Sequence, residues 1–103
     1  MEPRFDQLIQ GLIYKKFTQN GYVLEPEVRE ELKWDIARQL DDFIQSRAIA
    51  ALSDRNLRKY KKLKEQGKSR VELSDFADRH IPGNFERFLE FAMIEFEEVY
   101  LEH

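Results

Sequence analysis

Apolar residues recur at spacings of three and four along most of this chain, which is the pattern of amphipathic α-helices. The first such stripe lies between Pro3, which suits a helix start, and Asn20-Gly21, which suits a helix end. Its apolar members are Phe5, Leu8, Ile9, Leu12, Ile13 and Phe17. We expect the apolar connector Tyr22–Leu24 to pack, because three exposed apolar residues in a row are costly.

A second stripe begins at Pro26, where the surrounding glutamates suit the positive end of a helix dipole. Its predicted buried residues are Val28, Leu32, Ile36, Leu40, Phe43 and Ile44. Small and apolar residues continue the pattern as far as Leu52, so we expect one long helix over this stretch.

Two short helices are predicted next. Ser53 suits the N-cap of a helix that ends at Gly67 and has little apolar surface to bury. Its apolar residues are Leu57, Tyr60 and Leu63. Ser69 and Glu72 then form a capping-box pattern for a helix that ends near His80. The expected buried residues of that helix are Val71 or Leu73, with Phe76 and Ala77.

The last helix follows the break at Pro82-Gly83 and can be capped by Asn84. Its main apolar stripe consists of Phe85, Phe88, Leu89, Ala92, Phe96, Val99 and Tyr100. Phe91 and Ile94 fall outside that stripe, which is typical of a central helix or of one that makes a second contact. With no extended alternating pattern, the sequence predicts an all-α fold: one compact bundle of four to five helices with short connections, spanning residues 1–103.

Composition removes several classes of chemistry. The chain has 103 residues, 42% of them hydrophobic, and no cysteine, which excludes a disulfide framework, a thiolate metal site and a cysteine nucleophile. No apolar run is long enough to span a bilayer and no signal peptide is recognisable, so we expect a cytoplasmic protein that does not enter a membrane. The final residues 101–103 resemble the start of a vector-derived tag, and His103 is set aside.

Charge is strongly segregated along the sequence. The net charge is −3, yet the segment from Arg55 to Arg70 contains eight cations and one carboxylate. This gives the segment +7 and leaves −10 on the rest of the chain. Its cations can bind the phosphates of a nucleic acid, and Tyr60 can stack on an unpaired base. Alternatively, the cations solvate the helix surface and pair with acidic helices of the same chain, or they bind an acidic protein. The candidate binding residues are Arg55, Arg58, Lys59, Lys61, Lys62 and Lys64.

Candidate catalytic and metal-binding groups are few. Adjacent carboxylates on a helix point about 100° apart and do not converge on one ion. His80 follows Asp75, Asp78 and Arg79, and we expect it to favour a helix C-terminus while Asp75 pairs with Arg79. A hydrolase or metal site at His80 is the enzymatic alternative. With no second histidine for a serine nucleophile and no glycine-rich phosphate loop, we expect neither an enzyme nor a cofactor.

Trp34, Phe91 and Ile94 all lie off the main stripes of their helices. Such residues either complete an irregular core or anchor a protein interface. A core position is the commoner outcome for such residues, but the leading functional prediction takes them as interface anchors of a protein-interaction module that forms a homo-oligomer or binds another protein. Nucleic-acid binding through residues 55–70 is the alternative.

Three short motifs, in this order, resemble a family of short uncharacterised bacterial helical proteins. They are Leu24-Glu25-Pro26-Glu27-Val28, Ile81-Pro82 and Phe96-Glu97-Glu98-Val99-Tyr100-Leu101. The resemblance covers most of the chain and implies a helix opened by Leu and Pro, an Ile-Pro break and a last helix ending in Tyr-Leu. It implies no activity. The basic middle segment departs from the more acidic pattern of that family.

Overall fold

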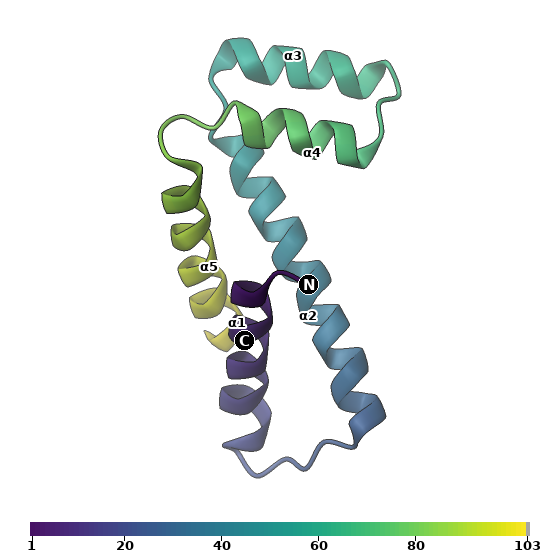
Figure 1. The fold of residues 1–103 in the computed structure, drawn as a ribbon, viewed down its shortest axis with the longest axis vertical. Coiled ribbons are helices and arrows are strands. Elements are labelled where there is room, and N and C mark those ends of the chain that lie inside the picture. Colours follow the sequence, from purple (N-terminus) through teal and green to yellow (C-terminus); the bar gives the residue numbers. More distant parts are fainter. Residues whose placement is uncertain (103) are drawn as a thin grey trace. The chain divides into compact units, whose positions relative to one another are not determined.

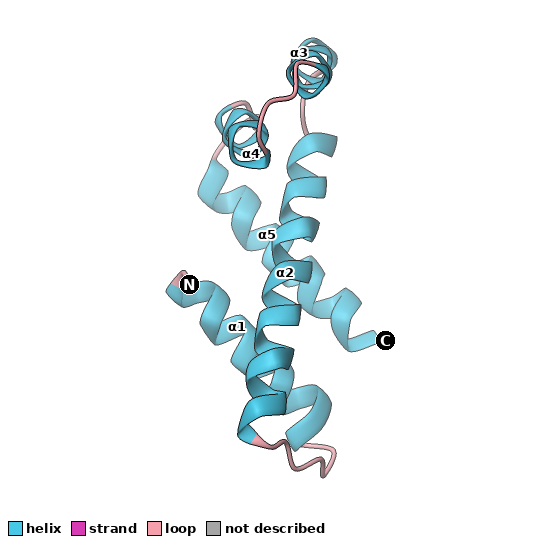
Figure 2. Ribbon diagram, turned by 90° about the vertical axis from the view of Figure 1, so that its right-hand side faces the viewer, coloured by secondary structure: helices cyan, strands magenta, loops and turns pink. Residues whose placement is uncertain are grey.

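In the computed structural model, which describes residues 1–102, helices are joined by turns and loops (Figure 2). The described residues contain five α-helices and one π-helical segment, η1. They are α1 (Pro3–Ile13), η1 (Tyr14–Thr18), α2 (Pro26–Ala50), α3 (Asp54–Glu65), α4 (Arg70–Arg79) and α5 (Phe85–Glu102). The prediction of an all-α fold with four to five helices is confirmed. His103 lies outside the described residues.

The chain forms two compact units. One unit, called the terminal unit, comprises Met1–Asp42 and Met93–His103; the other, called the central unit, comprises Phe43–Ala92. The division falls within α2 and within α5, so each of these helices contributes to both units.

Local capping fixes the helix starts that the sequence predicts. Ser53, Ser69 and Asn84 each accept a hydrogen bond from the backbone N–H three residues further on, at 3.2 Å in every case. These bonds satisfy donors that have no partner inside the helix. Gly67 ends α3 with a φ of +76°, and the following N–H of Lys68 donates to the carbonyl of Leu63 at 3.2 Å. All four predicted boundaries are confirmed.

The start of the chain contains a feature that periodicity did not predict. The stripe was expected to continue as an α-helix to Phe17, but Tyr14–Thr18 is π-helical, and the N–H of Gln19 donates to the carbonyl of Tyr14 at 2.7 Å. This bond joins residues five positions apart, where an α-helix joins residues four apart, and the turn is therefore wider. Lys15 and Lys16 lie on it, and both contact α5 within the terminal unit.

Two expectations about the next stretch are wrong. Most of the connector does not pack: Leu24 is partly buried, but Tyr22 is exposed, with its ring edge-on to Phe17 at 6.2 Å between centroids, and Val23 is 95% exposed. Val28 is also exposed. Eight residues separate it from the buried Ile36, and at 100° per residue this places Val28 about 80° away around α2.

Two further features of the long helices differ from the expectation: the end of α2 and the exposure of Val99 on α5. α2 stops at Ala50 and does not reach Leu52. Ser53 must adopt extended backbone to cap α3, with φ −62° and ψ 161°, so the chain turns before it. On α5, Val99 was expected on the buried stripe but is exposed.

Both units bury Ile, Leu and aromatic side chains, and the central unit adds buried alanines. In the terminal unit the largest fully buried residues are Ile9, Leu12, Ile13, Ile36 and Leu40. The central unit has a buried cluster of Ala48, Leu52, Tyr60, Leu73 and Ala77. Within that unit α3 and α4 lie side by side, as Figure 1 shows. The side of α3 that faces away from α4 is exposed to solvent.

Candidate functional site

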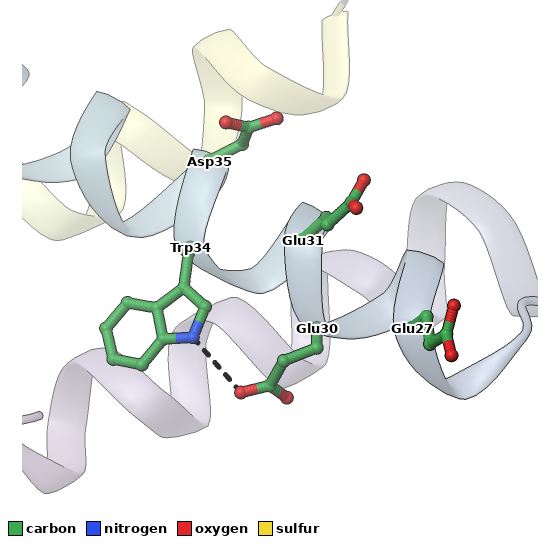
Figure 3. Close-up of a pocket in the computed structure, with 5 residues that line it drawn as sticks. All are labelled: Glu27, Glu30, Glu31, Trp34 and Asp35. Atoms are coloured by element: carbon green, nitrogen blue, oxygen red, sulfur yellow. Dashed lines mark hydrogen bonds between the residues drawn. The ribbon is translucent and has the colours of Figure 1, made fainter.

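The first candidate surface lies on the N-terminal half of α2, in the terminal unit. Glu27, Glu30, Glu31, Trp34 and Asp35 line an open hollow of about 590 Å³ (Figure 3). Because Glu27, Glu30 and Glu31 precede Trp34 by seven, four and three residues, helical geometry brings all three carboxylates to its side of α2. We call these five residues the Trp34 face.

Trp34 itself is 54% exposed, as expected of an interface residue. Its indole Nε1 donates to Oε1 of Glu30 at 3.1 Å, which Figure 3 marks with a dashed line. Nζ of Lys33 lies 5.5 Å from the ring centroid, within range of a cation–π interaction. The indole is therefore both exposed and held in place.

The remaining carboxylates of the Trp34 face are less constrained. Asp35 forms an ion pair with Arg38, one turn further along the same helix. Glu27 and Glu31 are exposed, and neither forms an ion pair with a described residue. The negative charge of this surface also acts on its surroundings. Burial raises the pKa of Tyr100, and the nearby charge of Asp35 raises it further.

Phe91 and Ile94, the other two predicted interface residues, are 59% and 56% exposed. The buried positions of α5 are Leu89, Ala92 and Phe96. Their spacing of three and four defines one face, and the two exposed side chains lie off it, as the sequence pattern indicates. Phe91 belongs to the central unit and Ile94 to the terminal unit.

The second candidate surface lies on α3, in the central unit. We call it the basic face. Its cations are all exposed, and within Phe43–Ala92, which is described throughout, none of them forms an ion pair. They are Arg55, Arg58, Lys59, Lys61, Lys62 and Lys64. All except Lys64 line, with Glu65, an open hollow of about 400 Å³.

Helical geometry explains why these cations face solvent. α3 buries Tyr60, with Leu57 and Leu63 partly buried beside it. Arg58 and Lys62 lie two residues before and after Tyr60, which places both about 160° away around the helix. Tyr60 is therefore a core residue in this structure, and the expected stacking of its ring on a base has no exposed ring to use.

Glu97, one of the acidic residues of the last helix, forms an ion pair with a lysine that sequence reasoning missed. Nζ of Lys15 lies 2.7 Å from Oε1 of Glu97, and Nζ of Lys16 donates to the backbone carbonyl of Tyr100 at 3.1 Å. Lys16 also lies 4.2 Å from the centroid of the Tyr100 ring. The carbonyls of a last helical turn lack helical partners and favour cations. The available signal was the pair of adjacent lysines within the first stripe, between Ile13 and Phe17.

His80 has a structural position at the end of α4. Its Nδ1 donates to the backbone carbonyl of Phe76 at 2.8 Å, and its ring stacks on the Phe76 ring with centroids 4.2 Å apart. The neighbouring interaction differs from the one expected. Nε of Arg79 donates to the backbone carbonyl of Asp75 at 3.3 Å, where an ion pair with the carboxylate was predicted.

Two other kinds of site are absent from residues 1–102. No three His, Asp or Glu side chains are grouped so that they could hold a metal ion. No helix in the same range combines the length and apolar character needed to cross a membrane.

Comparisons with known proteins identify no relative of this chain. No family model matches the chain, and neither the curated proteins nor the solved structures provide a match. The resemblance to short bacterial helical proteins therefore stays a prediction.

Proposed function

We propose that this protein is a cytoplasmic, non-enzymatic interaction module that self-associates, with Trp34 as its principal anchor. The observation that carries the proposal is the fixed and exposed indole: Glu30 and Lys33 hold a large apolar ring that stays open to solvent. Tryptophan is prominent among the residues that dominate protein interfaces. A side chain that is already ordered loses less conformational entropy on binding.

Phe91 and Ile94 support the same proposal. Each leaves more than half of its surface in water, and burying apolar surface contributes about 25 cal/mol per Å². A contact with another protein would remove that surface from water without disturbing the buried stripe of α5. His80, the candidate for catalysis, already has a role in packing against Phe76.

Light scattering at increasing protein concentration tests the proposal. We expect a mass above 12.4 kDa for the wild type, and a lower mass at the same concentration for Trp34→Ala, Phe91→Glu and Ile94→Glu. Gln39→Ala is the matched control, because Gln39 is exposed on α2 and lies about 140° around the helix from Trp34. A wild type that stays at the monomer mass throughout would contradict the proposal.

A second candidate function is nucleic-acid binding, which the exposed and unpaired cations of the basic face favour. Such binding releases counterions and weakens steeply as salt rises. We expect salt-sensitive retention on a polyanion column if this function holds, and earlier elution when Lys59, Lys61 and Lys62 are all changed to Gln.

The control for that experiment removes equal charge elsewhere. Arg38, Arg79 and Arg87 are exposed and lie outside the basic face, so their triple change to Gln should leave more retention than the lysine variant. Equal elution of the two triple variants would reject a specific role for the basic face in binding a polyanion.

A further inference from the structure

Residues of the Trp34 face and of the basic face recur at the same intervals along their helices, but in opposite chain directions. Along α3, Arg55 is followed by Arg58 and Lys62 at steps of three and four residues. Read backwards along α2, Trp34 is followed by Glu31 and Glu27 at the same steps. At 1.5 Å per residue, both series span about 10.5 Å on one helix side. Two antiparallel helices would therefore bring the members of each series together in pairs.

Each face also lacks the charge that the other supplies. The structure shows no ion pair for Glu27 or Glu31 among the described residues, and none for Arg55, Arg58 or Lys62 within the central unit. All five side chains are exposed. Opposite charges at an interface steer association and fix which surfaces meet.

We propose that the basic face of one copy docks, antiparallel, on the Trp34 face of a second copy. Arg58 then meets Glu31, and Lys62 meets Glu27. Arg55 lies over the indole of Trp34, since an Arg guanidinium binds the face of a Trp ring through cation–π attraction. This inference rests on the proposed self-association and names the two surfaces that carry it.

The docking mode has consequences for assembly. Because the two faces differ, each interface leaves one unused face of each kind, so assemblies grow with concentration unless they close into a ring. The contact depends on exposed charges, whose interactions are screened beyond about 10 Å at 0.1 M salt. Added salt should therefore lower the average mass, whereas association through apolar side chains alone should not weaken.

Paired charge reversals test the inference. The acid-reversed variant carries Glu27→Lys and Glu31→Lys, which places cations opposite Arg58 and Lys62. The base-reversed variant carries Arg58→Glu and Lys62→Glu, which places carboxylates opposite Glu27 and Glu31. We expect each variant alone to have the monomer mass in light scattering, and an equimolar mixture to recover a higher mass, because opposite charges then meet again at both pairs.

Two controls keep the result specific. Asp75→Lys with Glu90→Lys makes the same change in net charge as the acid-reversed variant, at exposed residues outside both faces, and should associate as the wild type does. Circular dichroism and thermal melting of every variant confirm that it is folded. Glu30 is left unchanged so that the hydrogen bond to Trp34 is kept.

The outcomes separate this inference from the proposed function. If the wild type associates but both reversed variants do so equally well, self-association stands and the docking mode is wrong. If the wild type is a monomer at every concentration, both are wrong. A monomeric wild type that binds single-stranded DNA, with the base-reversed variant failing to bind, assigns the basic face to nucleic acid and overturns the inference.

Discussion

The terminal and central units differ in both charge and core. The terminal unit contains 6 Lys and Arg against 13 Asp and Glu, a net charge of −7, while the central unit contains 11 against 7, a net charge of +4. The most deeply buried side chains of the terminal unit are Ile and Leu. The buried cluster of the central unit includes two alanines and a tyrosine.

This difference shows that one short helical chain can separate its charge by unit without placing charge in its cores. The core residues of both units are apolar, and no buried polar or charged residue is found in the described chain. The opposite charges lie instead on solvent-facing sides of α2 and α3. Like charges within a unit repel one another and oppose compaction, but they also let its surface attract a partner of opposite charge.

The largest expected effect comes from truncating the aliphatic core. Leu40→Ala removes a side chain that is almost fully buried in the terminal unit, and should lower the free energy of unfolding by about 2–5 kcal/mol. Urea denaturation measures the change. Gln39→Ala, at the exposed neighbouring position, should change stability by about 0.5 kcal/mol or less. Equal costs for the two variants would contradict the aliphatic core.

The central unit should be sensitive to enlargement instead. Ala77 is fully buried, so Ala77→Leu forces added atoms into a filled space and should cost about 1–3 kcal/mol in the same assay. Val71→Leu adds volume at an exposed position of the same helix, and we expect little change from it. If Ala77→Leu stabilised the protein, the cluster would contain a void and the contrast between the units would fail.

A smaller effect is expected at the start of α3. Ser53→Ala removes the hydroxyl that accepts from the N–H of Asn56, and should lower stability by about 1 kcal/mol. Ser46 is exposed within α2 and is not a cap, so Ser46→Ala should not produce this loss. Thermal melting of the pair distinguishes them, and matching melting temperatures would remove the capping role.

The smallest expected effect is a pH dependence in the terminal unit. The folded state raises the pKa of Tyr100 above its ordinary value of 10.0, mainly through burial. The folded protein then holds this proton more tightly than the unfolded chain, so stability is complete below about pH 10 and falls as pH rises beyond it. Tyr100→Phe should remove that part of the loss in melting temperature. Tyr14→Phe, at an exposed position, serves as the comparison.

Much of the fold was predictable from local chemistry. The caps at Ser53, Ser69 and Asn84 and the stop at Gly67 depend on a few neighbouring residues, so single-sequence reasoning located them. These features need only the geometry of one helix. The position of Trp34 off the buried stripe was also predicted, but it left a core role and an interface role both open, and its exposure depends on which elements pack against α2.

Other features depend on contacts that periodicity does not contain. The π-helical turn places Lys15 and Lys16 at the end of α5, and their partners are more than 80 residues away in the sequence. Val23 has the apolarity of a packed residue but no neighbouring helix covers it. The division of the chain into two units likewise depends on contacts between distant segments.

Self-association through the two faces is best tested by the average mass of the wild-type protein, measured by light scattering over a range of concentration and salt. We expect a mass above 12.4 kDa that rises with protein concentration and falls as salt is added. A mass of 12.4 kDa at every concentration, in low salt and high, would contradict it.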